Sequence, residues 1–394
     1  MLKSLKAFNI KDKCILLRVD FNVPMNGGKI LDDFRIRAAV PTIQHILRQG
    51  ASIVLMSHLG RPEGKENSEL SLMSVGEILA DLLEMPIKFS ANCVSEDARN
   101  VTIGLKPGEI HLLENLRFHK VEHQNNPRFS SLLAKHGQIF INDAFGTSHR
   151  AHASNVGVTD SFMNKGIGLL MEKEIQILSN LINRPRKPLV VVLGGAKISS
   201  KIGLIQKFIE TADFILIGGG MAFTFLKVMG KNVGKSMVDE KRLITAKKIL
   251  SLAREKAVLE FPKDFVCAPD PDKPEDSEVF KVGKIPDNMA GLDIGPETVE
   301  RYCRIIKTAG TVFWNGPMGV FEKPGFENGT RILSAALSEA TETGIITVTG
   351  GGDSAAALKK FNLVSGISHI STGGGAALEL LSGQPLPALT ALER

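Results

Sequence analysis

The chain has 394 residues, which is long for a single domain, so two domains are the better expectation. Apolar residues make up 43% of the chain and charged residues 23%, which is ordinary for a globular protein. The net charge of +6 is small for this length, and there is one Trp, one Tyr and no basic run with interleaved aromatic side chains. Nucleic-acid binding is therefore not expected.

Cysteine spacing and hydrophobic segments indicate the compartment. Cys14, Cys93, Cys267 and Cys303 are widely spaced and include no Cys-x-x-Cys pair. This spacing fits neither a disulfide framework nor a zinc site, and it indicates reduced thiols in a reducing compartment. Residues 1–10 lack a long apolar core and a cleavage site of small residues, and no apolar run approaches membrane length. We therefore expect a cytoplasmic protein with no membrane contact.

Four apolar segments of the first half are expected to be strands, and polar or cationic residues follow each one. The segments are Ile15–Arg18, Ile53–Met56, Ile110–Leu113 and Ile139–Ile141. Near their carboxyl ends, or in the loops that follow, lie five arginines: Arg18, Arg35, Arg61, Arg117 and Arg150. Parallel α/β sheets bind ligands at that edge, and guanidinium groups match phosphate and carboxylate oxygens. One arginine alone could equally be paired to a surface carboxylate, but five together predict a site for a small anion.

Helical patterns alternate with strands along the whole chain, which predicts parallel sheets with helices on both faces. Helices are expected at Arg35–Gln49, Ser74–Leu83, Ser199–Ile209, Glu240–Glu255, Pro296–Thr308 and Gly329–Thr341. The boundary between the halves lies near the amphipathic segment Met171–Asn183, which Pro185 and Pro188 should terminate. This segment is either a hinge or a surface helix of one domain.

The expected fold class is α/β, with two doubly wound parallel-sheet domains of similar size joined by a hinge helix. The N-terminal domain is expected to span residues 1–170, the hinge helix and linker residues 171–188, and the C-terminal domain residues 189–379.

Four segments of the second half run from an apolar strand through a glycine cluster into a helix start. They are Leu189–Lys197, Phe214–Ala222, Ile345–Ala355 and His369–Ala376. Such junctions direct backbone N–H groups and the positive end of a helix dipole at one place. A single cluster could be a tight turn, but four predict a polyphosphate site. Gly230–Ser236 resembles a P-loop, but only three residues separate its glycines and a helical segment precedes it, so it is rejected.

Charged residues beside these glycines are candidates for phosphate or metal contact. Lys197 and Lys201 stand four residues apart and are expected to share a helix face and reach phosphates; the alternative is a solvated pair. Asp353 closes a triple glycine, so it could face Mg²⁺ on a phosphate, cap a helix, or both. Glu322 could accept ribose hydroxyl groups or belong only to a turn.

Three histidines follow strands of the first half: His58, His149 and His152. They could be general bases or metal ligands. Phosphoryl transfer between oxygens of low pKa hardly needs a base, so ligand anchoring is the favoured role. A hydrogen-bonded structural role stays open for His149 and His152.

Eight blocks of sequence together resemble the phosphoglycerate kinase family. They are Asp20–Met25, Ser57–Pro62, Glu114–Phe118, Asp143–Ser154, Leu193–Lys197, Trp314–Gly319, Gly350–Ser354 and Ser371–Ala376. The resemblance covers essentially the whole chain in order, and no position that the family uses for chemistry departs from its pattern.

The resemblance implies a hinge-bending, monomeric enzyme of glycolysis. Such an enzyme moves the acyl phosphate of 1,3-bisphosphoglycerate to ADP, giving 3-phosphoglycerate and ATP, reversibly and with Mg²⁺ carried by the nucleotide. Its partners would be these small molecules alone. The tail, at about residues 380–394, would pack back on the N-terminal domain.

The resemblance also implies individual residue roles. The glycerate ligand would be held by Asp20, Phe21, Asn22, Arg35, His58, Leu59, Gly60, Arg61, Arg117 and Arg150. The nucleotide would be held by Gly194, Ala196, Lys197, Lys201, Gly291, Glu322, Gly351, Gly352, Asp353 and Ser354, with Asp353 facing the metal. Catalytic roles would fall to Arg35, Lys197, Gly352 and Gly374, with Arg35 and Lys197 flanking the transferring phosphoryl group.

Two other classes of protein remain open on the residues alone. A two-domain sensor that closes on an anion would keep the glycines and arginines, but it would not need Arg35, Lys197 and Asp353 together. A kinase acting on another carboxylate would share all the generic features, and only the family-specific blocks argue against it.

Overall fold

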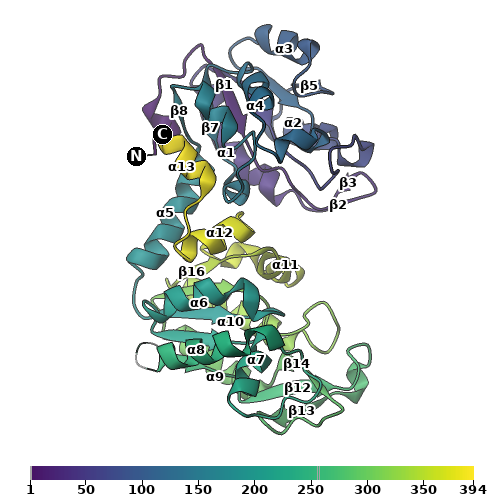
Figure 1. The fold of residues 1–394 in the computed structure, drawn as a ribbon, viewed down its shortest axis with the longest axis vertical. Helices are drawn as coiled ribbons and strands as arrows, with labels where there is room; N and C mark the ends of the chain where they lie inside the picture. The colour runs from purple at the N-terminus through teal and green to yellow at the C-terminus, as the bar shows by residue number, and fades with distance from the viewer. Residues whose placement is uncertain (1, 255, 257) are drawn as a thin grey trace. The chain divides into compact units, whose positions relative to one another are not determined.

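The chain divides into two compact units in a computed structural model that describes every residue except Met1, Glu255 and Ala257 (Figure 1). The first unit comprises Met1–Ile177 and Pro385–Arg394, and the second comprises Leu178–Gln384. The division falls inside helix α5 (Leu169–Asn183), so one continuous helix belongs partly to each unit. This helix ends before Pro185, as the sequence predicts.

A six-stranded parallel sheet forms the centre of the first unit, with the order β5-β6-β4-β1-β7-β8. Its strands are β1 (Cys14–Arg18), β4 (Ser52–Met56), β5 (Ile87–Ser90), β6 (Ile110–Leu113), β7 (Ile139–Asn142) and β8 (Lys165–Ile167). Arg18 pairs in register with Met56 on one side and Asn142 on the other. The loops that follow the four expected strands therefore leave the sheet at one edge.

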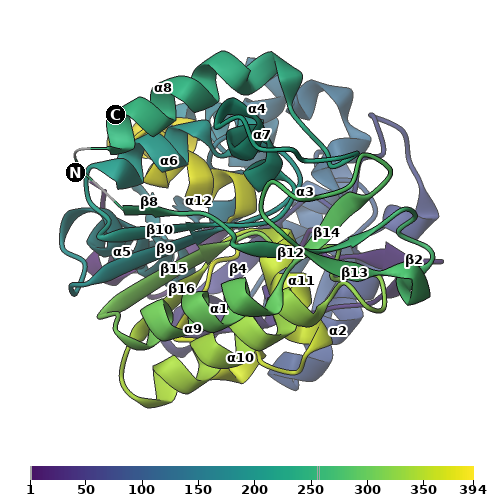
Figure 2. The same ribbon diagram turned by 90° about the horizontal axis from the view of Figure 1, so that it is seen from below.

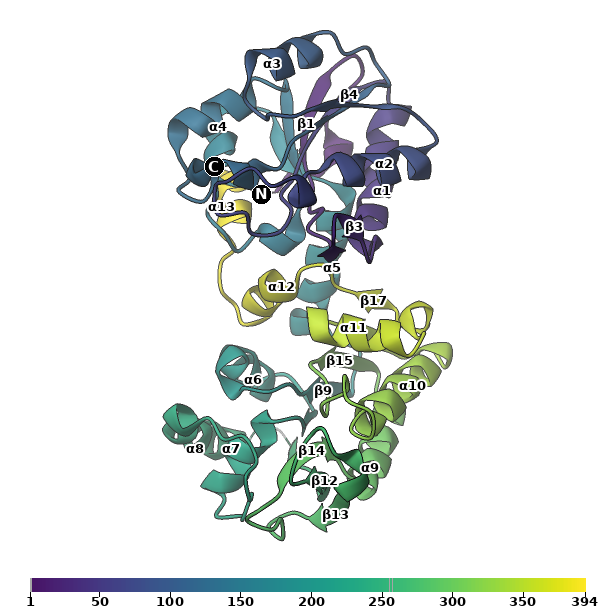
Figure 3. The same ribbon diagram turned by 90° about the vertical axis from the view of Figure 1, so that its right-hand side faces the viewer.

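Helices cover both faces of this sheet, with α1 and α2 on one side and α4 on the other (Figure 3). Helix α1 (Phe34–Arg48) buries Ile36, Ala39, Ile43 and Ile46 in the core, and this spacing of three to four residues is typical of a helix with one apolar face. The others are α2 (Met73–Leu83), α3 (Glu96–Ile103), α4 (Pro127–Ala134) and the C-terminal α13 (Pro387–Glu393). Helix α13 packs against β8 within this unit. A short hairpin pairs β2 (Met25–Asn26) with β3 (Lys29–Ile30).

A second six-stranded parallel sheet, ordered β11-β10-β9-β15-β16-β17, forms the centre of the second unit. Its strands are β9 (Leu189–Leu193), β10 (Phe214–Ile217), β11 (Val258–Glu260), β15 (Thr311–Asn315), β16 (Ile346–Thr349) and β17 (His369–Ile370). A small antiparallel sheet adds β12 (Asp264–Ala268), β13 (Glu278–Lys281) and β14 (Ala290–Ile294). The expected pair of doubly wound parallel-sheet domains is thus confirmed.

The helices of the second unit also lie on both faces of its sheet, α9 and α10 on one side and α6 and α8 on the other (Figure 2). They are α6 (Ile202–Ile209), α7 (Met221–Val228), α8 (Leu243–Ala253), α9 (Pro296–Lys307), α10 (Asn328–Glu342), α11 (Gly352–Lys360) and α12 (Gly374–Leu381). The helix expected at Glu240–Glu255 opens as a 3₁₀ turn at Glu240–Arg242 before α8, and its expected end, Glu255, lies outside the described residues. None of the helices in the described part of the chain is both long and apolar enough to cross a bilayer.

Candidate functional site

Cationic side chains gather at the carboxyl edge of the first unit's sheet, around His58. The imidazole is 3% exposed and directly follows β4. Burial, together with four arginine charges, holds the pKa of His58 well below its usual range; the arginines are Arg18, Arg117, Arg35 and Arg150. The structure therefore brings together four of the five arginines that the sequence singles out. Arg61 is exposed and is not among the charges that act on His58.

Hydrogen bonds to the loop after β1 orient Arg35. Its Nη1 donates to Asp20 Oδ2 at 3.1 Å and to the backbone oxygen of Asn22 at 3.0 Å. The Asp20 side chain is only 5% exposed, whereas that of Arg35 is 28% exposed. Hydrogen bonds thus fix one nitrogen of the Arg35 guanidinium, while part of the side chain remains exposed to solvent. Such a group is suited to contact with an anion.

The loop after β4 is tied to the same place by its backbone. Gly60 N donates to Asn22 Oδ1 at 2.9 Å, and the Gly60 oxygen accepts from Arg117 Nη1 at 2.6 Å. Gly60 has φ +61°, and a Cβ there would lie 2.7 Å from a methyl carbon of Leu70, so glycine is required. Phe21 and Leu59 are fully buried, and their N–H groups already donate to side-chain oxygens of Ser57 and Asn115. These two residues therefore support the loops from within.

Arg117 points to a missing anionic partner. The residue is 2% exposed, yet its Nε and Nη2 atoms find no hydrogen-bond partner among the residues that the structure describes. Burial, Arg150 and Arg18 lower its pKa to about 10, so the guanidinium remains charged at neutral pH. Buried polar groups are nearly always hydrogen-bonded, and a buried charge without a partner costs more still. A phosphate or carboxylate oxygen would satisfy both donors.

A cavity of about 460 Å³ opens among the glycine junctions of the second unit. Gly219, Gly220 and Gly291 contribute backbone, and Phe223 and Phe265 contribute aromatic surface. A Cβ on Gly291 would lie 2.3 Å from the Phe223 ring, so only glycine leaves the slot open. Glu322 and Asp353 supply carboxylates at the same cavity, and Ala196 also lines it. An apolar slot with a few charged groups is the usual form of a small-molecule site.

Several helices of this unit begin without a side-chain cap. Helices α7, α11 and α12 start after Gly220, Gly351 and Gly373, and no side chain caps any of these described helix starts. In the first unit, Ser95 and Asn126 cap α3 and α4 with hydrogen bonds of 3.1 Å, whereas α1 and α2 begin without a side-chain cap. Uncapped N–H groups, with the helix dipole behind them, favour phosphate oxygens.

Lys201 is the buried cation of this unit. Its Nζ donates to the side-chain and backbone oxygens of Asn315, the latter at 3.3 Å. Burial lowers the pKa of Lys201 to about 8, although the charge of Asp353 opposes the shift. The amide Nδ2 of Asn315 donates to Gly350 O at 2.6 Å. Asn315 thus ties the lysine to the loop that precedes α11.

The expectation that Lys197 and Lys201 share one helix face is wrong. Lys197 is exposed and extended (φ −126°, ψ 136°), and it precedes a 3₁₀ turn at Ile198–Ser200. Helix α6 begins only at Ile202, after this turn. The two lysines therefore lie in different surroundings: Lys197 is exposed to solvent and Lys201 is buried.

Positions around the triple glycine differ in accessibility. Asp353 is exposed in the first turn of α11, and the cap position is Gly351 with φ +94°, so the reading of Asp353 as the helix cap is wrong. Gly352 is exposed and Gly374 half-buried, each opening a helix. Ser354 is buried, and its hydroxyl accepts from Gly316 N at 2.6 Å. Gly194 is buried too, and it has no room for a side chain, because a Cβ there would lie 2.1 Å from Pro317 O.

Metal binding by protein ligands alone is not supported in the described part of the chain, where no group of three or more His, Cys, Asp or Glu side chains converges. The exposed carboxylate of Asp353 lies in the first turn of α11, beside its uncapped N-terminus. Mg²⁺ commonly uses one or two carboxylates together with substrate phosphates. The donor set therefore fits a metal that arrives on a nucleotide.

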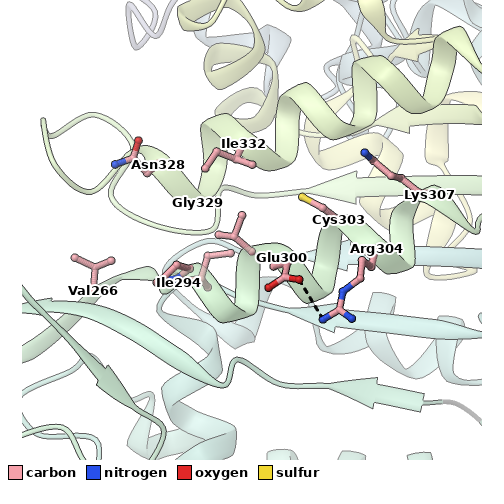
Figure 4. A pocket seen from close by; sticks show the side chains of 11 residues that line it. Val266, Ile294, Glu300, Cys303, Arg304, Lys307, Asn328, Gly329 and Ile332 are labelled. Carbon is pink, nitrogen blue, oxygen red and sulfur yellow. Dashed lines mark ion pairs between the residues drawn. The ribbon is translucent and has the colours of Figure 1, made fainter.

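A larger cavity, of about 530 Å³, lies between α9 and α10 (Figure 4). Its walls are mainly apolar, and its charged groups are engaged: Arg304 lies 3.7 Å from Glu300, and Lys307 lies 3.3 Å from Glu339. The groove runs along helix sides, away from the carboxyl ends of the strands. It lacks the convergent phosphate donors of the smaller cavity, so we do not assign the site to it.

Sequence reasoning missed residues whose roles depend on long-range contacts. Asn315 lies in the block Trp314–Gly319, but apart from that resemblance it has only its place at the end of an apolar strand, and nothing local shows that it meets Lys201. Phe223 lies on α7 and Phe265 on β12 of the small antiparallel sheet, and neither has a local pattern that indicates a cavity. Asp293 also lines the cavity; burial raises its pKa to about 7, and it accepts from Gly329 N at 2.6 Å. A strand-end position next to a glycine cluster is the one signal that could have found Asn315.

Known proteins share this architecture. The family profile described as Phosphoglycerate kinase matches residues 5–384. The phosphoglycerate kinases of Chloroherpeton thalassium and Thermosynechococcus vestitus are 45% and 46% identical to this chain, each over 99% of it and 98% of their own length. The solved phosphoglycerate kinase of Coxiella burnetii superposes with a TM-score of 0.89 and 38% identity, covering 100% of this chain and 99% of its own. That of Pyrococcus horikoshii gives 0.86 and 32%, covering 100% and 98%.

Proposed function

This chain belongs to the phosphoglycerate kinase family, and we propose that its two units each hold one substrate of the phosphoryl transfer. It is a glycolytic kinase that transfers phosphate to or from the carboxyl group of phosphoglycerate. The observation that carries the division of labour is chemical. One unit offers the buried Arg117, two of whose donors find no partner among the described residues, and the other offers uncapped helix N-termini around an apolar cavity.

The first unit is the site for 3-phosphoglycerate and 1,3-bisphosphoglycerate in this proposal. Arg117 and Arg150 bind the phosphate through bidentate contacts, and Arg35 lies nearer the reacting carboxyl group. Asp20, Asn22 and Gly60 hold these side chains and loops in place. His58 anchors the ligand, Arg61 closes over it from its exposed position, and Phe21 and Leu59 support the loops.

The second unit is the site for ADP and ATP. The base occupies the slot beside Gly291 and Phe223, and Glu322 accepts ribose hydroxyl groups. The phosphates meet the backbone of Gly194 and Ala196, the ammonium groups of Lys197 and Lys201, and the segment Gly351–Ser354. Support comes from the cavity lining and from the buried, Asn315-bound Lys201.

Asp353 would hold a Mg²⁺ ion carried by the nucleotide. When bound, the ion offsets phosphate charge and holds the phosphate oxygens in a fixed geometry. The chain contributes the exposed Asp353 carboxylate at the start of α11, with uncapped N–H groups behind it. The nucleotide supplies the remaining ligands.

Transfer is in line between the two ligands. In the ATP-consuming direction, a carboxylate oxygen of 3-phosphoglycerate attacks the γ-phosphorus, and the bond to the β-phosphate oxygen breaks to release ADP. Arg35 and Lys197 flank the moving group, and the N–H groups at Gly352 and Gly374 stabilise charge on its equatorial oxygens. The substrates sit on different units, so the reaction requires a hinge motion that brings them together and excludes water, with helix α5 as the hinge element.

We also propose that the enzyme acts as a monomer in the cytoplasm. Each half-site is built from residues of a single chain, so no second copy is needed to complete it. All four cysteines, Cys14, Cys93, Cys267 and Cys303, are free thiols, as suits a reducing compartment.

Hydrogen exchange with single ligands tests the division of labour. We expect 3-phosphoglycerate to slow amide exchange in the loops after β1, β4 and β6, and ADP with Mg²⁺ to slow it at Gly219–Phe223 and Gly351–Ser354, because bound ligands stabilise what they contact. Both ligands together should also shorten the distance between fluorescent labels placed on the two units. Protection of the glycine junctions by 3-phosphoglycerate alone would overturn the assignment.

Nucleotide capture should weaken in alkali because of Lys201. Its pKa of about 8 means that the ammonium loses its proton as the pH rises through that value in the free enzyme. Since kcat/KM reports the free enzyme, kcat/KM for ATP should fall above about pH 8. The KM for 3-phosphoglycerate, measured in the same buffers, serves as the internal control. A value of kcat/KM for ATP that stays constant up to about pH 9.5 would contradict a phosphate-binding role for this lysine.

A further inference from the structure

A buried hydrogen-bond relay of three side chains, Arg18, Ser154 and Glu122, adjoins His58 in the first unit. Arg18, 1% exposed, donates from Nε to Ser154 Oγ at 2.9 Å. The Ser154 hydroxyl donates in turn to Glu122 Oε1 at 2.6 Å, and Ser154 N donates to Glu122 Oε2 at 3.0 Å. Ser154 and Glu122 are 0% and 1% exposed. A serine thus bridges a buried guanidinium and a buried carboxyl group.

The donors set the direction of this relay. Arginine can only donate, so the Ser154 oxygen accepts from it, and the Ser154 hydroxyl sends its single hydrogen to Glu122. Both Glu122 oxygens then accept, as the two oxygens of a carboxylate can. Burial raises the pKa of Glu122, and the charge of Arg18 and the two bonds from Ser154 oppose that shift. His152 Nδ1 is 4.0 Å from Glu122 Oε1, too far to compete as a donor.

The other end of Arg18 sets the tautomer of His58. Arg18 Nη2 lies 3.3 Å from His58 Nδ1, and because the guanidinium donates, Nδ1 must carry the lone pair. Neutral His58 then has its hydrogen on Nε2. The competing partner is Asp20, whose Oδ1 lies 3.9 Å from the same Nδ1 and would favour a hydrogen there. The position of Arg18 therefore decides between two tautomers.

We propose that Ser154 and Glu122 are positioning residues of the glycerate site: they hold Arg18 so that it fixes His58 as the Nε2–H tautomer, the form that offers an N–H donor to the bound anion. This inference rests on the function proposed above for the first unit. With Nδ1 occupied, Nε2 is the one ring nitrogen that can meet a ligand, and an anion needs a donor there. Neither Ser154 nor Glu122 touches the ligand.

Isosteric replacement of Glu122 breaks the relay without removing volume. In Glu122→Gln the amide has one acceptor oxygen, but two donors of Ser154 face it, so one bond is lost whichever way the amide turns. Ser154→Ala removes the bridge itself. Ser130→Ala is the matched control, because Ser130 is a buried serine of the same unit whose hydroxyl bonds to the backbone oxygens of Asn126 and Ala153.

The test reads the tautomer directly, without substrate. In protein labelled with ¹⁵N-histidine, two-bond ¹H–¹⁵N correlation spectra distinguish the protonated ring nitrogen, and His58→Gln identifies the His58 signals among the nine histidines. We expect Nε2–H in the wild type and in Ser130→Ala, and an Nδ1–H population in Ser154→Ala and Glu122→Gln. An Nδ1–H tautomer in the wild type would overturn the proposal, as would an unchanged tautomer in both relay variants. If one relay variant does not fold, the other and the wild type still decide.

Kinetics supply the second readout. Losing one donor to a charged ligand should raise the KM for 3-phosphoglycerate about tenfold or more in the relay variants. The KM for ATP should stay within about twofold, because the relay lies in the first unit and the proposed nucleotide site lies in the second. An equal rise in both constants would indicate general damage and overturn the positioning role. Failure of the proposed function would look different: no wild-type turnover, whatever the tautomer.

Discussion

Replacing Arg35 with alanine is expected to lower kcat about 10²–10³-fold, because a cation placed at the transferring phosphoryl group stabilises charge that develops only in the transition state. The structure shows why this arginine is suited to the role. Two hydrogen bonds, to Asp20 Oδ2 and Asn22 O, fix Nη1, while 28% of the side chain remains exposed. Little reorganisation is then needed during the reaction.

Two comparisons make this prediction specific. Arg35→Lys keeps the charge but loses the fork and should retain only part of the activity. Arg37→Ala, on the same helix, removes an exposed arginine that pairs with Asp33 at 2.8 Å, and it should leave kcat unchanged. A variant Arg35→Ala with wild-type kcat and a raised KM for 3-phosphoglycerate would show that Arg35 only binds the ground state.

Replacing Arg117 with methionine is expected to weaken 3-phosphoglycerate binding and to stabilise the free enzyme at the same time. Removing a buried cation from a ligand contact typically costs 2–5 kcal/mol, so the KM should rise about 30-fold or more. In the free protein, however, two of its donors have no hydrogen-bond partner within the described part of the chain, and the burial that lowers its pKa to about 10 disfavours the charged form. Methionine fills similar space without that cost, so the thermal midpoint should rise by about 2–4 °C.

Thermal unfolding with and without ligand checks both halves of this prediction. Saturating 3-phosphoglycerate should raise the midpoint of the wild type and leave that of Arg117→Met almost unchanged. ATP with Mg²⁺ should stabilise both proteins equally, which serves as the control. A free variant that melts well below the wild type would contradict the view of Arg117 as an unsatisfied charge, and an undiminished response to 3-phosphoglycerate would remove it from the site.

The fold follows from the sequence because its signals are local. Strand Leu189–Leu193 is an unbroken apolar run, as a strand buried on both faces of a parallel sheet must be. Gly220, Gly351 and Gly373 mark the junctions at which α7, α11 and α12 begin. The same logic put the arginines at the carboxyl edge of the first sheet. These features depend on a few neighbouring residues each.

What the sequence could not supply depends on contacts between distant segments. The 3₁₀ turn at Ile198–Ser200 separates Lys197 from Lys201, and the attraction of Lys201 to Asn315 links positions 114 residues apart. Ser154 and Glu122 meet Arg18 across three segments of chain, and although Ser154 ends the block Asp143–Ser154, no local pattern shows that it bridges Arg18 and Glu122. The unsatisfied state of Arg117 is likewise visible only once burial and partners are known.

The most direct test of the whole account is formation of an acyl phosphate by the purified wild-type protein from ATP and 3-phosphoglycerate, with trapping of the product by hydroxylamine. We predict turnover that requires both substrates and Mg²⁺. A folded protein that forms no acyl phosphate, or that hydrolyses ATP equally well without 3-phosphoglycerate, would contradict the assignment and would favour another carboxylate substrate or a non-catalytic anion sensor.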